Sequence, residues 1–579
     1  MSANTGMPGV FLRAIALLAW ACLSGELVAQ DGPSFLREPV VEANINKRAP
    51  LVAFVKFTAS APATAVVNIR GEGETRELAF KPEVDPTAGL PLLGLPAGKR
   101  FEVQVSLKDA RGRITAVSRK LTHVTARVPE GRVDFPPMQL RVADVARQEP
   151  GYFLLSVRRR ALGRAVDLTP AQTSFMLDWG LLLALDTRGR VVWYYESPDR
   201  IAGIARLKNG NILYNTADGV AREIDLLGNV QREIVSGRAR ERGASGLLLD
   251  ARVIHHLPHE LPDGNFLLFT AEQRRLENSY LDEFDPALPR GPRDVVGDVI
   301  TIVDNNDGRK LWTWNTFDFL DTNRIGYTEG TYWWTRGFPG SFDWTHGNGV
   351  YFDAKNDAVV FGLKFQDAIF SVNRTSKKIN WILGEPTDWG ALGAFTLKPV
   401  GQPFRWPWRM HNPRVSHKGT VVVFDNGTHE ARPPRTPKPP HQVFSRGVEY
   451  EVDPVARTVR QVWASDDSLT ADSCHAMAMG DAWRLPRTDN MLVIFGACID
   501  MRPGVTISDL QIGPKMIPAN MLPQHSRIVE YTRETPARKV FDLRFEDPYQ
   551  LVQWQTFGGE KLASLYPHGM LAAESAGDP

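Results

Sequence analysis

The sequence predicts an all-β protein in which a small fibronectin- or immunoglobulin-like β-sandwich precedes a six-bladed β-propeller. The prediction rests on short alternating apolar runs, on the turn residues between them, and on a recurring strand pattern. The chain has 579 residues, more than one hydrophobic core usually supports, so at least two domains are expected. Its 48 glycines, 41 prolines and 15 tryptophans suit many short strands and turns better than long helices.

The first expected domain covers residues 33–130. Apolar and polar positions alternate there in short runs such as 51–57 (LVAFVKF) and 100–106 (RFEVQVS), with glycine- and proline-containing turns between the runs. Alternation with a period of two is typical of strands that bury one face. The pattern predicts the small sandwich, and the proline-bearing stretch 128–137 is the expected linker.

The second expected domain, residues 140–579, repeats two short phrases. In the first, a turn precedes a β-branched strand that ends near an aromatic residue, as in 186–193 (DTRGRVVW) and 307–312 (DGRKLW). The second places Asn-Gly or Asp-Gly between apolar runs, as in 207–213 (LKNGNIL) and 261–267 (LPDGNFL), which is a strong hairpin signal. Six copies at even spacing predict six propeller blades. A single large, irregular β-sandwich is the alternative.

The first 29 residues have the order of a secretory signal peptide. Arg13 precedes the apolar run 14–23, and a small residue, Ala29, ends the segment at the expected cleavage site. The apolar run is too short to cross a bilayer, and no other stretch is long and apolar enough to do so. We therefore expect a periplasmic or secreted protein without a membrane span. A buried terminal helix is the alternative.

The net charge and the cysteines of the chain bear on its expected partners and on a disulfide bond. The net charge is +2 and no long basic run occurs, so nucleic acid is not an expected partner. Beyond the signal segment only Cys474 and Cys498 remain, on either side of the turn expected at 485–490. Two strands folded about that turn would bring the cysteines opposite each other, and an oxidising compartment favours a disulfide. Two buried free thiols are the alternative.

Candidate chemistry is carried by histidines that stand just ahead of predicted strands in different blades. They lie in 254–260 (IHHLPHE), 343–348 (DWTHGN) and 408–413 (WRMHNP). The inner strands and loops of a propeller converge on a central channel, so we expect these histidines to face it. One such histidine alone is more often structural than catalytic. The spacing of His255 and His259 suggests a metal site only weakly, because Pro258 argues against a helix and no third ligand is evident.

Four motifs resemble the bacterial arylsulfotransferase family, the PAPS-independent aryl-sulfate sulfotransferases. Residues 343–350 (DWTHGNGV) resemble its Asp-Trp-x-His-x-Asn-Ser motif, and 364–369 (KFQDAI) fall where the family has Arg-x-Gln-Ser-Ala-Ile. His411 followed by 421–427 (VVVFDNG) is similar to its His and Leu-Phe-Asp-Asn-Gly stretch, and 445–450 (SRGVEY) match Ser-Arg-x-Val-Glu-Tyr. The order and spacing of the motifs, from about Tyr152 onward, carry the resemblance.

The resemblance implies sulfuryl transfer between phenols by a ping-pong route. His411 would attack the sulfur of an aryl sulfate and hold it as sulfohistidine, and His256 would act as general acid and base. His255 and His259 compete with His256 for that role. His346 and Asn348 would bind the sulfuryl oxygens, with the positive charge of Lys364 facing them. The expected partners are small aryl sulfates and phenols, with a homodimer left open. No metal or organic cofactor follows from this scheme.

The chain departs from the family pattern at three positions. Lys364 replaces an arginine and loses the planar fork that holds two oxygens at once. Leu257 stands where an orienting aspartate is common, and Gly349 replaces a serine. These departures keep open a non-catalytic propeller that binds an anionic or aromatic ligand.

A quinoprotein dehydrogenase would need an acidic calcium site and stacked tryptophans, for which the sequence has no coherent motif. Tryptophans are expected instead to pack between strands, at Trp193, Trp312, Trp381 and Trp463.

Overall fold

The computed structural model describes residues 32–162, 168–285, 287–328, 332–438, 442–466, 468, 470, 472–500 and 523–575. The expected signal peptide, residues 1–29, lies outside the described residues. The regular secondary structure of the described chain consists mainly of β-strands, with only short helices, so the all-β prediction is confirmed. Among its helices, none is long and apolar enough to cross a membrane.

Two sheets at the N-terminal end share one hydrophobic core, in which strand residues alternate between buried and exposed as the sequence predicts. The first sheet has the order β1 (Phe35–Ala43), β2 (Ala53–Ala59), β5 (Leu90–Leu92). The second has the order β38 (Leu571–Ser575), β4 (Glu74–Phe80), β3 (Thr64–Gly71), β6 (Arg100–Lys108), β7 (Ile114–Val117), with β8 (Leu121–Val124) also on β6.

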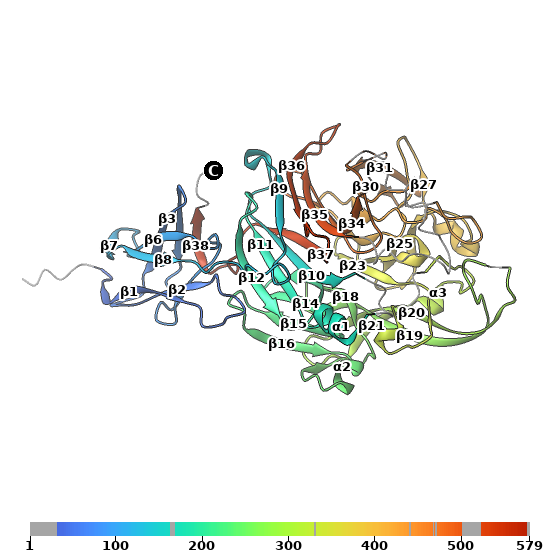
Figure 1. The fold of residues 1–579 in the computed structure, drawn as a ribbon, viewed down its shortest axis with the longest axis horizontal. Coiled ribbons are helices and arrows are strands. Elements are labelled where there is room, and N and C mark those ends of the chain that lie inside the picture. The colour runs from blue at the N-terminus through green and yellow to red at the C-terminus, as the bar shows by residue number, and fades with distance from the viewer. Residues whose placement is uncertain are drawn as a thin grey trace, which may run out of the picture.

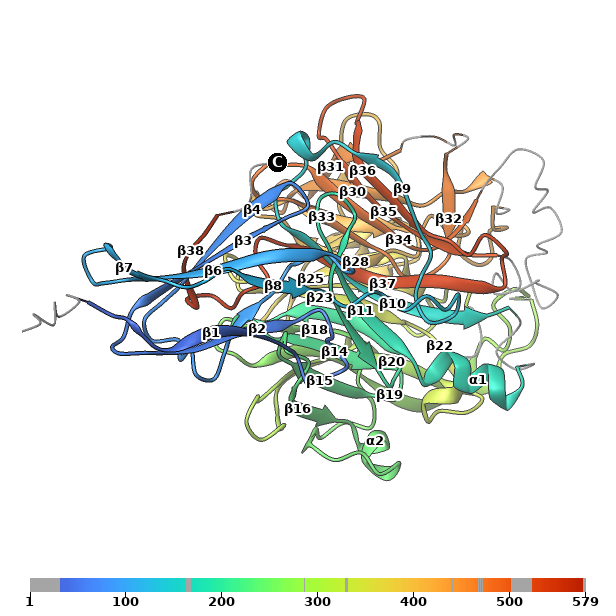
Figure 2. The same cartoon turned by 60° about the vertical axis from the view of Figure 1, so that its left-hand side comes forward.

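The strand β38 comes from the opposite end of the chain. It pairs antiparallel with β4, with Leu571 opposite Phe80, so the C-terminal part of the described chain returns to the N-terminal sheets. Figures 1 and 2 both show this red strand beside the blue N-terminal sheets. The sequence does not predict this return.

Six further sheets make up the rest of the described chain. The first three have the orders β12 (Val191–Ser197), β11 (Gly180–Leu185), β10 (Tyr152–Ala161), β37 (Val552–Leu562); then β13 (Ile201–Arg206), β14 (Ile212–Thr216), β15 (Val220–Ile224), β16 (Val230–Val235), β17 (Leu247–Leu248); then β18 (His255–Glu260), β19 (Phe266–Ser279), β20 (Gly291–Val303), β21 (Lys310–Asn315), with β22 (Phe342–Asp343) on β20.

The other three have the orders β23 (Gly347–Asp353), β24 (Ala358–Leu363), β25 (Ala368–Asn373), β26 (Ile379–Gly384); then β27 (Lys398–Pro399), β31 (Thr458–Ala464), β30 (Arg446–Asp453), β29 (Val421–Asp425), β28 (His411–Val415); then β32 (Cys474–Ala476), β34 (Met491–Asp500), β35 (His525–Tyr531), β36 (Lys539–Phe545), β9 (Met138–Ala143), with β33 (Asp481–Arg484) on β34.

One strand of each of these six sheets contacts its counterpart in the next sheet. The contacts run from β13 to β18, β23, β28, β33 and β37, and β37 returns to β13, so the ring closes. Because β37 pairs with β10, the first of the six sheets joins both ends of this region. The ring strands are where the chain can bring side chains of distant sequence together.

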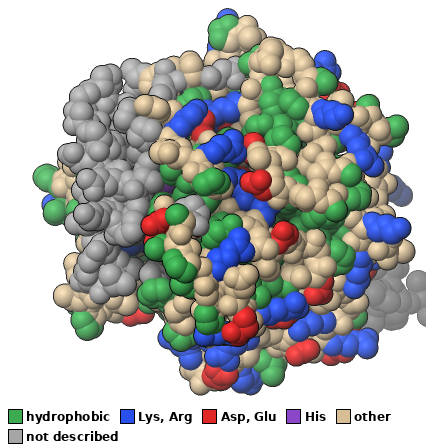
Figure 3. Space-filling view, turned by 90° about the vertical axis from the view of Figure 1, so that its right-hand side faces the viewer, with side chains coloured by type: hydrophobic (Ala, Val, Ile, Leu, Met, Phe, Trp, Pro, Cys, Tyr) green, Lys and Arg blue, Asp and Glu red, His purple; other side chains and the backbone are tan. Residues whose placement is uncertain are grey.

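Helices in the described chain are short and lie between strands. They are α1 (Pro170–Leu177), α2 (Gly237–Glu241), α3 (Thr316–Phe319) and the 3₁₀ turns η1 (Val145–Arg147), η2 (Trp334–Arg336), η3 (Lys364–Gln366) and η4 (Gly390–Phe395). Thr169 caps α1 and Pro170 occupies its first turn, as expected for a helix start. At the end of the molecule opposite the N-terminal sheets, Lys and Arg side chains lie in the middle of the face as well as on its rim (Figure 3).

Candidate active site

Three of the predicted histidines stand at the same end of neighbouring ring strands. His256 is the second residue of β18, His346 immediately precedes β23, and His411 begins β28. All three side chains are buried. His256 and His346 have φ angles of 57° and 51°, which are uncommon for residues other than glycine and change the direction of the side chain relative to strand alternation.

The structure brings His256 and His346 into ring contact. Their centroids are 5.3 Å apart in an edge-to-face arrangement. Tyr332, which sequence reasoning missed, lies against both rings, with centroid distances of 6.0 Å to His256 and 4.4 Å to His346. His259, in contrast, packs on Tyr351 at 4.8 Å. Of the histidines on β18, His256 is therefore the one in contact with His346.

Hydrogen bonds define the tautomer of His411. Its Nδ1 is 2.7 Å from Asn426 Oδ1, and Asn426 Nδ2 donates to the carbonyl oxygens of Ala476 and Met479. Because the amide nitrogen faces two acceptors, the amide oxygen must accept, and Nδ1 of His411 carries the proton. The lone pair therefore lies on Nε2, which accepts the backbone N–H of Met479 at 3.1 Å.

Two buried carboxylates orient the other imidazoles. Asp343 Oδ2 lies 2.6 Å from His346 Nδ1, while its Oδ1 accepts from the indole of Trp333. Asp343 belongs to the DWTHGN motif, but its position three residues before His346 was not assigned a role from the sequence. A carboxylate that contacts one nitrogen of an imidazole fixes the tautomer and the ring orientation.

His256 receives similar support through its neighbour. Asp298 Oδ1 lies 3.1 Å from His255 Nε2, and the Nδ1 atoms of His255 and His256 are 2.7 Å apart. A proton on His255 Nε2 leaves its Nδ1 lone pair to accept from His256 Nδ1–H, and this leaves Nε2 of His256 unprotonated. The aspartate expected at the position of Leu257 is thus replaced by a more distant carboxylate acting through His255.

Lys364 begins η3 and is almost completely buried, at 1% exposure. Its backbone N–H donates to the carbonyl of His346 at 3.1 Å. Burial is the main cause of the lowered pKa of His411, and the charge of Lys364 lowers it further. Burial and Asp298 raise the pKa of Asp343 well above its ordinary value, and the charge of Lys364 opposes that rise, so the ammonium group lies within electrostatic reach of both residues. The structure therefore brings Lys364 together with the predicted histidines.

Asn348 lies in the site, but its amide nitrogen already donates a hydrogen bond to the backbone. Asn348 Nδ2 donates to the carbonyl of Met410 at 2.5 Å, next to His411. This bond ties β23 to the start of β28 and makes Asn348 a residue that positions His411. Position 349 requires glycine for a steric reason, because a Cβ there would lie 2.5 Å from Asn412 Cα. The serine common in the family would not fit this close approach.

Burial favours the neutral forms of His256, His411 and His429. It lowers the pKa of His256 well below the ordinary value, with smaller contributions from neighbouring histidines and Arg336. Burial is also the largest cause of the lowered pKa of His411, followed by the charge of Lys364. His429, missed from the sequence, has its pKa lowered by burial, Arg409, His475 and Lys364. It follows the VVVFDNG motif by two residues, a spacing that could have identified it.

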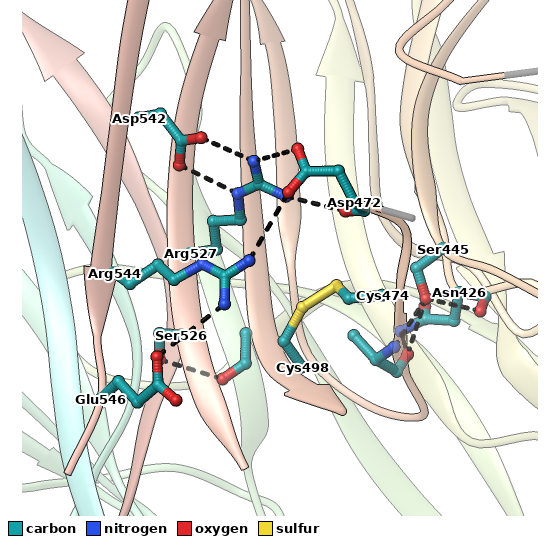
Figure 4. The surroundings of a disulfide bond; sticks show 12 residues. Asn426, Ser445, Asp472, Cys474, Cys498, Ser526, Arg527, Asp542, Arg544 and Glu546 are labelled. Atoms are coloured by element: carbon teal, nitrogen blue, oxygen red, sulfur yellow. Dashed lines mark hydrogen bonds and ion pairs between the residues drawn. A yellow bond between two sulfur atoms is a disulfide. The ribbon is translucent and has the colours of Figure 1, made fainter. Parts of the chain in front are cut away.

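The predicted disulfide between Cys474 and Cys498 is present, with a Cα–Cα distance of 5.5 Å. It joins β32 to β34 close to the anchor of His411. Two residues after Cys474, Ala476 accepts from Asn426 Nδ2 with its oxygen and donates its N–H to Ser445 Oγ at 2.7 Å. Figure 4 shows the disulfide between the Arg527 ion pairs and the hydrogen bonds of Asn426 and Ser445. The disulfide thus holds the strand against which Asn426 is fixed.

Replacing both cysteines by serine is expected to lower stability and activity together. The bridge closes a sequence separation of 24 residues. A loop of that size predicts a loss of about 3 kcal/mol in the free energy of unfolding. Loosening Ala476 should also free Asn426 and slow any reaction that needs an oriented His411. Chemical denaturation and initial rates at 25 °C measure the two effects. Peptide mapping that finds two free thiols in the exported wild-type protein would contradict the bridge.

The sequence of this chain is similar to those of known proteins over the region that contains these histidines. The profile of the family described as Arylsulfotransferase (ASST) matches residues 171–551. The arylsulfate sulfotransferases AssT of Escherichia coli O6:H1 and of Lelliottia amnigena are each 33% identical over 138 residues, which span 21% of this chain and 22% of the relative. The chain thus aligns with about a fifth of the length of these relatives.

Solved structures give weaker similarities. A protein of unknown function from Bacteroides caccae has a TM-score of 0.33 at 12% identity, covering 71% of this chain and 99% of that one. The β-propeller domain of Cps50 (Swd1) from Myceliophteria thermophila has a TM-score of 0.30 at 7% identity, covering 71% of this chain and 100% of that one. Scores this low do not bear on the fold. The profile match, in contrast, extends over most of the chain and includes all three histidines at the ring strands, and this chain therefore belongs to the arylsulfotransferase family.

Proposed function

We propose that this protein transfers a sulfuryl group from an aryl sulfate ester to a phenolic acceptor through a sulfohistidine on His411. The observation that carries the proposal is the fixed tautomer of His411. Asn426 holds the proton on Nδ1, so the lone pair is on Nε2, and burial keeps the ring neutral. A neutral imidazole with one oriented lone pair is a good nucleophile and, once sulfated, a good leaving group.

In the first half-reaction, Nε2 of His411 forms a bond to sulfur while the bond between sulfur and the aryl oxygen breaks. The aryl oxygen keeps the electron pair and takes a proton from His256. In the second half-reaction an acceptor phenol gives its proton to His256 and its oxygen bonds to sulfur. The bond between sulfur and Nε2 then breaks and returns its electrons to the imidazole. Asn426 Oδ1 stabilises the charged ring by accepting from Nδ1–H throughout.

The protonation of His256 follows from its surroundings. In the free protein burial lowers its pKa, so the ring is neutral and can act as a base. A bound sulfate ester brings a negative charge next to His346 and His256, which favours the protonated form. The same residue can therefore serve as acid when the ester is bound and as base afterwards.

The sulfuryl oxygens require fixed positive charge and donors. Lys364 and His346 are the residues proposed to face them, with Asp343 holding His346 in place. Asn348 is proposed to act through Met410 by positioning His411, in addition to the contact with the sulfuryl group that the family motif implies.

A protein that binds such ligands without turnover is the second candidate, and one observation favours it. His411 Nε2 accepts the N–H of Met479, so attack requires that hydrogen bond to break. The cost of breaking one hydrogen bond to a buried donor is about 1–3 kcal/mol, small compared with a catalysed barrier. The enzyme therefore remains the better-supported candidate.

The deciding experiment incubates the purified protein with 4-nitrophenyl sulfate in the presence and absence of phenol. We expect nitrophenol release that depends on phenol, and formation of phenyl sulfate. With the donor alone, the intact protein should gain the mass of one sulfuryl group, and peptide mapping should place it on His411. Binding of the ester without release of nitrophenol, for several phenolic donors, would favour the binding protein instead.

We also propose an architecture for the chain and a location for the protein. The closed ring of six sheets supports a six-bladed propeller over residues 140–579, and the shared core of the two N-terminal sheets supports a β-sandwich over residues 33–130. The disulfide supports an oxidising compartment, which is consistent with export by the segment 1–29 and a periplasmic or secreted location.

A further inference from the structure

Four arginines, which we call the arginine cluster, lie together beside the histidines. Arg158 and Arg160 are two residues apart on β10 and so share one face of that strand. Arg200 precedes β13, and Arg336 ends η2. Arg159 points to the other face of β10, where its guanidinium lies 4.2 Å from the ring of Phe175.

In the described part of the chain, no carboxylate forms an ion pair with any member of the cluster. Arg158 donates to Gln555 Oε1 at 3.2 Å and contacts Met479 Sδ, and Arg336 donates to the carbonyl of Tyr332 at 2.9 Å. Nitrogen atoms of Arg160 and Arg200 are buried without a hydrogen-bond partner.

Two more deeply buried arginines are paired with carboxylates. Arg446 contacts Asp425, and Arg527 contacts both Asp472 and Asp542. The four arginines of the cluster are partly buried and have no carboxylate partner. Partly buried positive charges without a counter-charge are costly when they lie together, so the cluster indicates a place for an anion.

The electrostatics of the cluster agree with its geometry. Burial, together with the charges of Arg160 and Arg336, lowers the pKa of Arg158 to about 9. Burial lowers the pKa of Arg160 to about 10. Burial first, and then the charges of the other three arginines, lower the pKa of Arg200 well below its ordinary value. Tyr332 counteracts these shifts for Arg158 and Arg200. A bound anion would relieve this mutual repulsion.

Two aromatic side chains, Phe557 and Tyr332, connect the cluster to the histidines. The guanidinium of Arg158 lies 5.5 Å from the ring of Phe557, and that ring lies 5.6 Å from His256. Arg336 stacks on Tyr332 at 3.9 Å, and Tyr332 contacts His346. The rings of Phe557 and Tyr332 therefore lie between the cluster and the histidines of the proposed site of sulfuryl transfer.

We propose that the arginine cluster is a subsite for an anionic substituent on the aryl substrate, such as a carboxylate, a phosphate or a second sulfate. The aromatic ring of the substrate would lie against Tyr332 and Phe557, with the reacting oxygen toward the histidines and the anionic substituent toward the arginines. The proposal rests on the function proposed above and narrows its substrates to aryl compounds with two polar ends.

The test compares two acceptors that differ only in charge, 4-hydroxyphenylacetate and 4-hydroxyphenylacetamide. Wild-type protein is expected to prefer the anion by about tenfold or more in kcat/KM, since hydrogen bonds between charged groups are worth more than neutral ones. Arg336→Gln and Arg200→Gln should each reduce this ratio several-fold, and Arg336→Lys should restore much of it. Arg159→Gln, on the opposite face of the same strand, is the matched control and should keep the ratio.

Calorimetric binding of the same two compounds gives a readout that does not need turnover. If the wild type binds the anion better but transfers to neither compound, the proposed function fails and the subsite stands. If transfer occurs with equal kcat/KM for both compounds, or if Arg336→Gln and Arg200→Gln leave the ratio unchanged, the subsite is wrong. Circular dichroism of each variant separates loss of charge from loss of fold.

Discussion

Replacing His411 by alanine is expected to reduce sulfuryl transfer by roughly a thousandfold or more, because the variant has no nucleophile to carry the group between donor and acceptor. Donor and acceptor would have to meet in one step, which the geometry of a ping-pong site does not provide. Initial rates of nitrophenol release from 4-nitrophenyl sulfate measure the loss. The mass of the protein after incubation with donor alone measures the covalent intermediate, which should disappear.

The control for this substitution is His417→Ala. His417 is exposed on the turn after β28, where its Nε2 lies 3.1 Å from Asp489 Oδ1, so its removal should leave the rate near that of the parent. His346→Ala should lose most transfer, because it removes the ring that Asp343 holds beside His256. A His411→Ala protein that folds normally and retains near-parental transfer would show that another residue accepts the sulfuryl group.

The sequence located the histidines because each stands beside a strong local signal. A turn followed by a β-branched run predicts the start of a strand, and His346 and His411 lie at those starts. The same motifs contained Asn426, whose role depends on Ala476 and Met479, about 50 residues further along the chain. Local patterns identify such residues but not what they contact.

Residues that enter the site from distant parts of the chain could not be predicted in this way. Asp298 lies in the middle of β20 and reaches His255 only because β18 and β20 share a sheet. Tyr332 lies on the connection between α3 and β22, in a stretch of aromatic residues that gives no periodic signal. The return of β38 to β4 is likewise carried by a strand, 571–575 (LAAES), whose sequence has no clear alternation. Closure of the ring and pairing between distant segments are set by tertiary packing, which one sequence does not encode in a local pattern.

Replacing Lys364 by methionine is expected to slow transfer by a factor of about 10²–10³, because it removes a fixed charge next to the transferring sulfuryl group. Methionine has a similar length and suits the buried position, so the fold should survive. Lys364→Arg keeps the charge and is expected to preserve or improve transfer, since a guanidinium can hold two oxygens at once. Steady-state kcat and KM for several phenolic donors measure the effect.

The pH dependence of Lys364→Met tests the same contact independently. His411 must be neutral to attack, and the charge of Lys364 helps to hold its pKa well below the ordinary value. In the parent, kcat/KM should therefore not lose activity through protonation of His411 as the pH falls from 8 to 6. Removing the lysine charge raises the pKa of His411, so the acid-side decline of kcat/KM should begin at a higher pH. Lys364→Arg should keep the parental profile. A methionine variant with the parental rate and an unchanged acid limb would show that this ammonium group faces neither His411 nor the sulfuryl group.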